Sequence, residues 1–342
     1  MKKGTLYIDG KDAWEEYGVY VTEDGWNALI AYPPLKTPTS NDWQEYHGKE
    51  VDLSSPVLNT REVEIEFGVH GLFSQLSSLV VALSDGAYHT LRSEFLGGRE
   101  WKVRVVSFSN LSEAVTMGTM KVKVADDFPE LHREFQDPES SVAEYDDYEL
   151  DGIPLAWWGV RVLEGTLDEL KTPPAVKKNL LRNIATQSGA IYDADGGVMY
   201  DTKDAKLYCL LRAKTYEELW RCYDALLYDL TKPEERNIWV RELELDFPCY
   251  YKSCSVTDFF PDDGKLWLQF TLTMTLTGGT IDTNTDAVLA TEVLPDVVGT
   301  EETGENSAVN LSPDKVAEET AETAAEVAET ALNDTSDETP TA

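Results

Sequence analysis

The second half of this chain repeats the pattern of the first half, and this repeat limits the possible folds more than any other feature. Asp9-Gly10 is followed eight residues later by Gly18-Val19-Tyr20-Val21. Asp151-Gly152 is followed seven residues later by Gly159-Val160-Arg161-Val162. Self-similarity over such a distance is typical of a duplicated structural unit.

The match continues in register beyond these segments. A Pro-Pro pair comes next in both halves, at Pro33-Pro34 and Pro173-Pro174, and a glycine follows after 14 residues in the first half and 15 in the second, at Gly48 and Gly189. The later segments correspond in the same order. The pairs are Val63–Phe67 with Leu207–Leu211, Leu72–Leu83 with Thr215–Leu230, Trp101–Val103 with Trp239-Val240, and Met120–Val124 with Leu266–Leu272. We therefore interpret the chain as a tandem duplication of one β-rich unit.

Each unit is predicted to contain several strands and one flanking helix. Apolar residues recur at helical spacing in 72–83 and again in 215–230, where Thr215 and Glu218 have the spacing of a capping box. The other matched segments alternate in hydrophobicity, as strands with one buried face do. The predicted fold class is therefore mainly β, with two β-sandwich or barrel domains.

The stretch 42–69 combines strand patterns with acidic residues. Glu50–Leu53 and Val63–Phe67 alternate in hydrophobicity, and the Ser/Pro/Asn-rich connection between them predicts a long hairpin. When the apolar residues of the second strand face the core, its glutamates point the other way, because successive side chains of a strand alternate. We expect an acidic row that faces water or a lumen. The candidate lumen-facing residues are Glu62, Glu64 and Glu66.

Composition divides the chain into four segments. We expect a first domain at 1–125, an acidic linker at 126–147, a second domain at 148–280, and an Ala/Glu/Thr-rich tail at 281–342. The tail contains 16 acidic residues, one lysine and no aromatic residue, which is too little apolar surface for a core. It is either a solvated acidic tail, largely disordered or transiently helical, or an adaptor helix for a partner.

The net charge of −34 argues against tight binding of nucleic acid and against binding to an anionic membrane. No apolar run has the length of a signal peptide or a membrane span, so we expect the chain to be made in a cytoplasm without membrane insertion. Four cysteines at irregular spacings predict reduced thiols.

No established catalytic motif occurs in the sequence, and we expect neither an enzyme nor a cofactor. Asp193-Ala194-Asp195-Gly196-Gly197 resembles the start of a calcium loop but lacks the closing glutamate, so a hairpin turn between Ile191-Tyr192 and Val198–Tyr200 is preferred and no metal site is expected. Trp157 and Trp158 are the candidate interface or glycan-binding aromatics, and packing in the core is their other interpretation.

The predicted order of strands, long hairpin, one helix and closing strands resembles the tail-tube fold of tailed bacteriophages. The run from Pro33-Pro34-Leu35-Lys36 through Asp42-Trp43 and Gly48 to Glu50–Leu53 looks like the distal tail and baseplate hub proteins of long-tailed phages. The second-half run from Gly159–Val162 to Pro174, Lys177, Gly189 and Asp193 looks similar to them as well. The resemblance covers about 1–280 and leaves out the acidic tail.

This resemblance implies a structural virion protein at the tail tip, assembled in the bacterial host cytoplasm, with no catalytic residues to carry over. In the family, six tube domains with flanking helices form a ring through which the genome passes. A chain with two copies reaches six as a trimer, as hub proteins do, whereas distal tail proteins more often use six chains. The implied partners are the chain itself, the tail-tube protein, the tape-measure protein and the tail-tip or receptor-binding proteins. The alternative is a carbohydrate-binding or adhesin β-sandwich.

Overall fold

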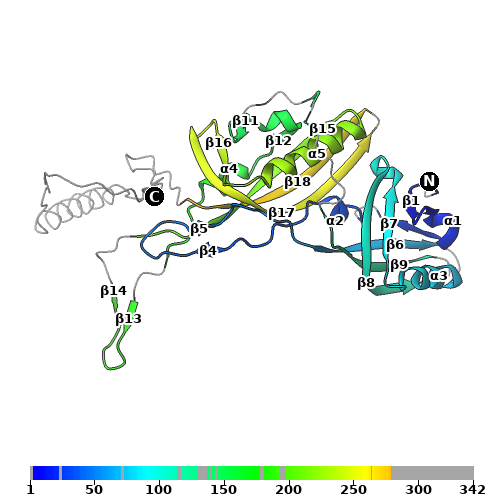
Figure 1. The fold of residues 1–342 in the computed structure, drawn as a ribbon, viewed down its shortest axis with the longest axis horizontal. Helices are drawn as coiled ribbons and strands as arrows, with labels where there is room; N and C mark the ends of the chain where they lie inside the picture. Colours follow the sequence, from blue (N-terminus) through cyan, green and yellow to red (C-terminus); the bar gives the residue numbers. More distant parts are fainter. Residues whose placement is uncertain are drawn as a thin grey trace, which may run out of the picture. The chain divides into compact units, whose positions relative to one another are not determined.

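The computed structural model describes residues 3–22, 25–70, 73–113, 117–129, 137–138, 140–142, 145, 147–177, 181–192, 198–262 and 264–278. The acidic tail and the loop at Asp193–Gly197 lie outside the described residues. The predicted mainly β class is confirmed, because two seven-stranded sheets form the framework of the described chain and contain many more residues than its helices (Figure 1).

The first repeat forms one sheet of seven strands in the order β2-β1-β7-β8-β9-β6-β3, and all of its pairs are antiparallel. Its strands are β1 (Leu6–Ile8), β2 (Lys11–Asp12), β3 (Val19–Val21), β6 (Arg61–His70), β7 (Tyr88–Ser93), β8 (Arg99–Glu113) and β9 (Met117–Asp126). Its helices are α1 (Ala13–Tyr17), α2 (Asn27–Ile30), α3 (Phe73–Leu83) and the 3-10 helix η1 (Glu94–Leu96). The predicted helix at 72–83 is thus present as α3.

The second repeat forms a second sheet in the order β11-β10-β16-β17-β18-β15-β12. Its strands are β10 (Tyr148–Leu150), β11 (Ile153–Pro154), β12 (Val160–Val162), β15 (Lys203–Ala213), β16 (Arg236–Val240), β17 (Leu245–Asp262) and β18 (Lys265–Leu276). Its helices are the 3-10 helix η2 (Leu155–Trp158), α4 (Thr166–Lys171) and α5 (Tyr216–Leu230). Two further strand pairs, β4 (Ser40–Asn41) with β5 (Glu50–Val51) and β13 (Leu181–Asn183) with β14 (Ala190–Tyr192), lie outside the two sheets.

Helix α5 begins where its sequence predicts. The Thr215 hydroxyl accepts the N–H of Glu218 at 3.2 Å, which satisfies one of the free donors of the first turn. The Glu218 carboxylate turns back to accept the N–H of Lys214 at 2.9 Å and of Ser141 at 2.7 Å. This variant of a capping box ties the helix to the segment before the second sheet.

The two sheets have the same strand order, so the second repeat follows the topology of the first strand for strand. One predicted correspondence is wrong. Trp239 lies on β16, which takes the place of β7, whereas Trp101 lies on β8, which takes the place of β17. A tryptophan near the start of a strand was therefore not a sufficient marker of corresponding strands. The predicted domain boundaries stay predictions, although β9 continues one residue into the expected linker, to Asp126.

Strand β6 alternates as predicted, with Val63, Ile65 and Phe67 buried and the glutamates between them on the other face. The predicted hairpin between Glu50–Leu53 and this strand is wrong. Strand β5 pairs with β4, and β6 pairs with β3 and β9. The turn predicted between Ile191-Tyr192 and Val198–Tyr200 falls on residues outside the described part of the chain, and β14 on its near side pairs with β13. Hydrophobic alternation identifies a strand but does not identify its partner.

Buried apolar side chains from both repeats belong to one connected cluster. All four cysteines are free thiols, and Cys209, Cys222 and Cys249 are buried. None of the helices in the described part of the chain is both long and apolar enough to cross a membrane.

Candidate functional site

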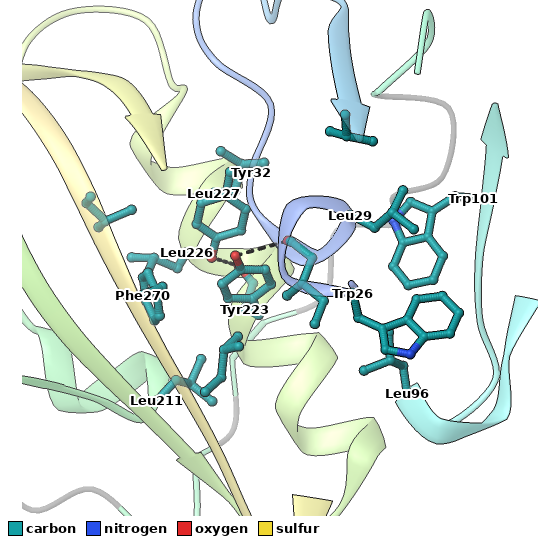
Figure 2. Close-up of a cluster of buried hydrophobic side chains, with 14 of the residues drawn as sticks. Trp26, Leu29, Tyr32, Leu96, Trp101, Leu211, Tyr223, Leu226, Leu227 and Phe270 are labelled. Carbon is teal, nitrogen blue, oxygen red and sulfur yellow. Dashed lines mark hydrogen bonds between the residues drawn. The ribbon is translucent and has the colours of Figure 1, made fainter. Parts of the chain in front are cut away.

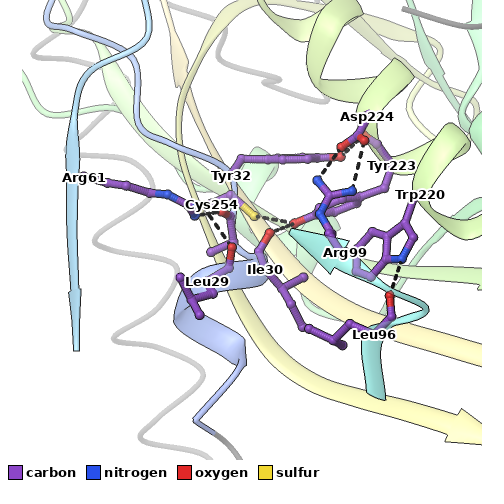
Figure 3. A network of polar contacts seen from close by, with 11 residues as sticks. Leu29, Ile30, Tyr32, Arg61, Leu96, Arg99, Trp220, Tyr223, Asp224 and Cys254 are labelled. Carbon is purple, nitrogen blue, oxygen red and sulfur yellow. Dashed lines mark hydrogen bonds and ion pairs between the residues drawn. The ribbon is translucent and has the colours of Figure 1, made fainter. Parts of the chain in front are cut away.

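The most extensively built polar and aromatic site joins the two repeats. We call it the junction: α2, residues 30–35 and loop 94–99 of the first repeat meet α5, β17 and β18 of the second repeat (Figures 2 and 3). It contains buried aromatic rings, two arginines and a set of hydrogen bonds between residues far apart in the sequence. The arrangement is suited to holding two β units together.

Two tyrosines lie at the centre of the junction. The rings of Tyr32 and Tyr223 are stacked with centroids 4.0 Å apart, and both side chains are buried (Figure 2). Each hydroxyl donates to the other segment: Tyr32 to the carbonyl of Tyr223, and Tyr223 to the carbonyl of Ile30 at 3.2 Å. Burial raises the pKa of Tyr223 well above its usual range, so this donor keeps its proton. The pair therefore buries large apolar area without leaving a hydroxyl unsatisfied.

An extended segment after Tyr32 lies along β17. The Pro33 carbonyl accepts the hydroxyl of Tyr251 at 2.9 Å, and the Leu35 N–H donates to the carbonyl of Lys252 at 2.9 Å. Lys252 is the extra residue of a β-bulge, because the pairing of β17 with β18 shifts between Tyr251 and Ser253. A bulge turns a backbone group out of the ladder, where another segment can reach it.

The loop 94–99 closes the other side of the junction. Trp220 donates its indole N–H to the Leu96 carbonyl at 2.8 Å, and Tyr216 donates its hydroxyl to the Phe95 carbonyl at 3.0 Å. Gly97 has a φ of +69°, and an added Cβ would lie 2.5 Å from the Cβ of Tyr216. Only glycine permits both this backbone conformation and this close approach.

Arg99 carries the principal ion pair between the repeats. Its guanidinium makes two hydrogen bonds to Asp224, at 3.0 and 2.8 Å, and lies 4.3 Å from the centre of the Trp220 ring (Figure 3). Burial is the largest single influence and acts to lower the pKa of Arg99, but the charge and the hydrogen bonds of Asp224, with smaller contributions from Tyr223 and Tyr32, together raise it, so the arginine stays charged. A bidentate ion pair of this kind fixes the orientation of the guanidinium and the carboxylate as well as the distance between them.

Arg61 holds α2 in place from within the first repeat. It donates to the carbonyls of Ala28 at 3.3 Å, Leu29 at 3.0 Å and Ala31, and it pairs with Asp126 at 3.2 Å (Figure 3). Burial lowers the pKa of Arg61, and Asp126 opposes that shift. A cation at the carbonyl end of a helix is favourable, and here it positions the segment that enters the junction.

Residues 34–59 form an extended hairpin that we call the first arm. Its stem is held by Asn59 N–H to Pro34 carbonyl and by Lys36 N–H to Val57 carbonyl, each at 2.8 Å. The corresponding segment of the second repeat, which we call the second arm, is described at 175–177, 181–192 and 198–201, and its base is held in the same way by Asp201 N–H to Ala175 carbonyl at 2.8 Å and Lys177 N–H to Met199 carbonyl at 2.7 Å. Each repeat therefore carries one arm at the same place in its topology.

The first arm contacts the base of the second arm. Lys177, which is buried, donates to the Asp42 carboxylate at 2.8 Å and to the Trp43 carbonyl at 2.7 Å. The Gly48 N–H donates to the Tyr200 carbonyl at 2.8 Å, and the ring of His47 stacks on Tyr200. The arm is thus tied to the second repeat by backbone, charge and ring contacts together.

The three glutamates of the predicted acidic row lie on the expected face of β6, and lysines of the neighbouring strand lie beside them. Glu62, Glu64 and Glu66 lie on the face opposite the core, and their lysine partners come from β9. Lys123 pairs with Glu62 at 2.5 Å, and Lys121 pairs with Glu64 at 2.8 Å and with Glu66 at 3.9 Å. Strand β9 therefore places two cations beside the three carboxylates, so this face is mixed in charge. Whether this face lines a lumen stays a prediction.

The two candidate surface tryptophans lie in different environments. Trp158 is 1% exposed and donates its indole N–H to Asp229 at 2.9 Å, so it is a core residue and is not available to a partner or a glycan. Trp157 is 55% exposed, and its role stays a prediction. Among the described residues no group of three or more His, Cys, Asp or Glu side chains could hold a metal ion.

Sequence reasoning did not single out the junction residues Tyr32, Arg99, Tyr223 and Asp224. One signal was present. Helix α5 has buried residues around more than one face, because Ala225 and Leu227 lie on opposite sides of it and both are buried, whereas a helix that covers one sheet needs a single stripe. An apolar surface wider than one stripe indicates a second packing partner.

No known protein-family profile matches the chain. No curated protein matches it either. Among solved structures, the chain is similar to the Dit protein (gp 19.1) of phage SPP1, described as a paradigm of the hub adsorption apparatus in phages that infect Gram-positive bacteria. The likeness covers 80% of this chain and 98% of that one, at 9% sequence identity and a TM-score of 0.29.

Proposed function

We propose that this chain is a structural protein of the tail tip of a tailed bacteriophage, at the distal-tail or baseplate-hub position. One observation supports this most directly. The residues that carry the sequence resemblance to those proteins are also the residues that join the two repeats, since Pro33, Leu35, Asp42, Trp43 and Gly48 all contact the second repeat. A duplicated β unit with an arm that binds the next unit is the arrangement expected of a ring component.

In this role the chain binds copies of itself and joins the tail tube to the host-recognition apparatus. Its expected partners are the tail-tube protein, the tape-measure protein and the tail-tip or receptor-binding proteins. We expect a ring of six repeats, which three chains supply, or a ring of six chains. No catalytic step is proposed, and the site of action is the virion.

We expect DNA to pass the ring without being retained. The net charge of −34 opposes the counterion release that drives binding of a phosphate backbone. The lysine pairs on β6 and β9 make the Glu62–Glu66 face mixed in charge, so the expectation rests on the whole chain and not on that face. A gel-shift assay at low salt should detect no retained duplex, and tight binding would contradict the expectation.

The experiment that tests the proposed function is localisation in the virion. Antibodies raised against the purified chain and labelled with gold should bind the tail tip of phage particles whose genome encodes it, and peptides from it should occur in purified virions. Antibodies against a major capsid protein provide the control for labelling elsewhere on the particle. Absence of the chain from intact virions would contradict the proposal.

A carbohydrate-binding protein is the second candidate, and the exposed Trp157 favours it. An exposed indole can stack on a sugar ring, and Trp157 is 55% exposed beside the buried Trp158. A glycan array should decide between the candidates. Binding that is lost in Trp157→Ala would favour this function, and the absence of binding is the result we expect.

A further inference from the structure

Because the two repeats share one topology, each position of the junction has an equivalent position in the other repeat. These equivalent positions do not contact each other within the described part of the chain. Strands β8 and β17 carry a bulge at the same place, because the pairing shifts between Val105 and Ser107 in β8 and between Tyr251 and Ser253 in β17. Val106 therefore takes the place of Lys252, whose carbonyl receives the incoming arm. Val106 is 40% exposed.

The incoming segment also has a counterpart. Leu35 bridges Leu58 across the first arm, and Val176 bridges Tyr200 across the second arm, with matching hydrogen bonds on either side. Val176 therefore takes the place of Leu35, and it is 56% exposed. Its supporting helix is held in the same way, because Lys203 donates to the carbonyls of Glu169 and Thr172 at the end of α4, as Arg61 does at the end of α2.

The helix that receives the arm is matched as well. Both α3 and α5 begin soon after their strand, and the buried residues Leu76, Leu79 and Leu83 have the spacing of Leu219, Cys222 and Leu226. In this alignment Val81 takes the place of Asp224. Val81 is 71% exposed, although it is an apolar residue on a helix. A large apolar side chain so exposed is suited to contact with another protein.

Both residues of the junction ion pair, Arg99 and Asp224, have apolar equivalents in the other repeat. The register of β7 with β8 and of β16 with β17 places Leu245 where Arg99 lies in the first repeat. The charged pair Arg99 and Asp224 thus corresponds to the apolar pair Leu245 and Val81. Both corresponding positions are therefore apolar, and neither leaves a charge without a partner.

We propose that chains associate head to tail through these two surfaces. Val176, Leu245 and the end of α4 in one chain dock on Val81 and the bulge at Val106 in a second copy of the chain. That this contact belongs to a ring rests on the proposed function. The contact itself is between two copies of this chain. One chain contributes the first surface and its neighbour contributes the second, so every chain added still has one surface of each kind free. Such a head-to-tail assembly grows until the last chain binds the first and closes a ring.

Two further features fit a second copy. Gly189 takes the place of Gly48 in the arm and has nothing within 4 Å of where a Cβ would be, whereas a Cβ on Gly48 would lie 1.8 Å from the Thr277 carbonyl oxygen. An open hollow of about 500 Å³ lies at the end of α4, lined by Thr172, Pro173, Pro174 and Lys203 among others. The second arm and the surface at its base therefore have room for a neighbouring chain.

The test uses a charge pair that the junction already contains. In the full-length chain, Val81→Asp and Leu245→Arg should each raise the apparent Kd of self-association by about tenfold or more, because each buries an unpaired charge. The double variant carries both changes and should restore association, because it recreates the Arg–Asp pair of the junction in every contact. Mass photometry and analytical ultracentrifugation give the Kd, and Ile153→Asp, at an exposed apolar position on β11, is the matched control.

The double variant also separates a lost interface from a lost fold. A variant that fails to fold is not rescued by a second charge, and the thermal unfolding of the dilute chain reports folding directly. The inference is overturned when the unchanged chain stays monomeric at every accessible concentration, when both single variants associate normally, or when the double variant associates no better than the weaker single one. A chain found in the tail tip whose single variants associate normally would contradict this interface alone, and association by these surfaces in a chain absent from virions would contradict the proposed function alone.

Discussion

Arg99 places a guanidinium between an aspartate and an indole of the other repeat. Arg99 and Asp224 are 19% and 20% exposed, so their pair is only partly screened by water. We predict that Asp224→Ala lowers the free energy of unfolding by about 1–3 kcal/mol, because it leaves the arginine without its charge partner. Chemical denaturation measures the change.

A matched control for this prediction is Glu242, whose carboxylate pairs with Lys171 at 3.6 Å on the surface. Exposed pairs contribute little, so Glu242→Ala should leave the unfolding midpoint almost unchanged. Equal losses in the two variants would show that the junction pair has no special part in stability.

The rate at which the Cys254 thiol is alkylated depends on how tightly the junction is packed, because its sulfur lies beside Tyr223. Burial raises the pKa of Cys254 to about 11, so little thiolate is present at pH 8. Tyr32→Ala removes the ring that stacks on Tyr223, whose hydroxyl lies 3.8 Å from the Cys254 sulfur. We predict that this variant speeds alkylation of Cys254 several-fold but leaves the buried Cys249 unreactive.

Peptide mass spectrometry after a timed reaction with iodoacetamide at pH 8 distinguishes the two cysteines. The urea-unfolded chain gives the reference rate for each. If Cys254 and Cys249 accelerate equally in Tyr32→Ala, the variant has loosened the whole fold rather than the junction.

At the scale of elements, the arms carry a matched pair of glycines. Gly48 has a φ of +66° and contacts Thr277, and Gly189 has a φ of +87° with open space around it. Alanine at either position adds backbone strain of about 1 kcal/mol, but only Gly48→Ala adds a clash with a backbone oxygen. We predict a larger fall in the melting temperature of the dilute chain for Gly48→Ala than for Gly189→Ala.

Differential scanning calorimetry at a concentration where the chain is monomeric makes the comparison. The difference between the two variants isolates the docking of the first arm from the strain that both share. A Gly189→Ala variant that melts as low as Gly48→Ala would place the second arm against its own chain.

Local patterns in the sequence predicted the elements whose signal lies within the element. The alternation in Arg61–His70 gave the buried face of β6, and the spacing in 215–230 gave α5 together with its Thr215 cap. The repeat also predicted two units of one architecture. These features are determined by residues close together in the sequence, so a local pattern is enough to predict them.

The remaining features depend on which distant segments meet. Lys121 lies beside Glu64 only because β9 pairs with β6, and Tyr32 meets Tyr223 across 191 residues of sequence. Hydrophobic periodicity contains no information about such pairings. The lysine partners of the acidic row and the contacts of the junction were therefore beyond what the sequence patterns could predict.

At the scale of the whole molecule, the acidic tail is expected to add nothing to the stability of the repeats. Residues 281–342 have no aromatic residue and a large excess of acids, so they offer little apolar surface for docking. We predict that a chain ending near Gly279 unfolds cooperatively within a few degrees of the full chain. A fall of tens of degrees in thermal unfolding followed by circular dichroism would show that the tail is docked.

Self-assembly into a ring is the property that the proposed role in a tail tip requires most directly. The first repeat binds the second through an arm, a bulge and an ion pair, and the positions that correspond to the arm and the bulge, Val176 and Val106, are exposed. Cryo-electron microscopy of the purified full-length chain measures the outcome directly. We predict closed rings of six repeats, or of six chains, in which Val176 of each chain lies at the Val106 bulge of the next. Monomers at high concentration, even with the neighbouring tail proteins present, would contradict the account.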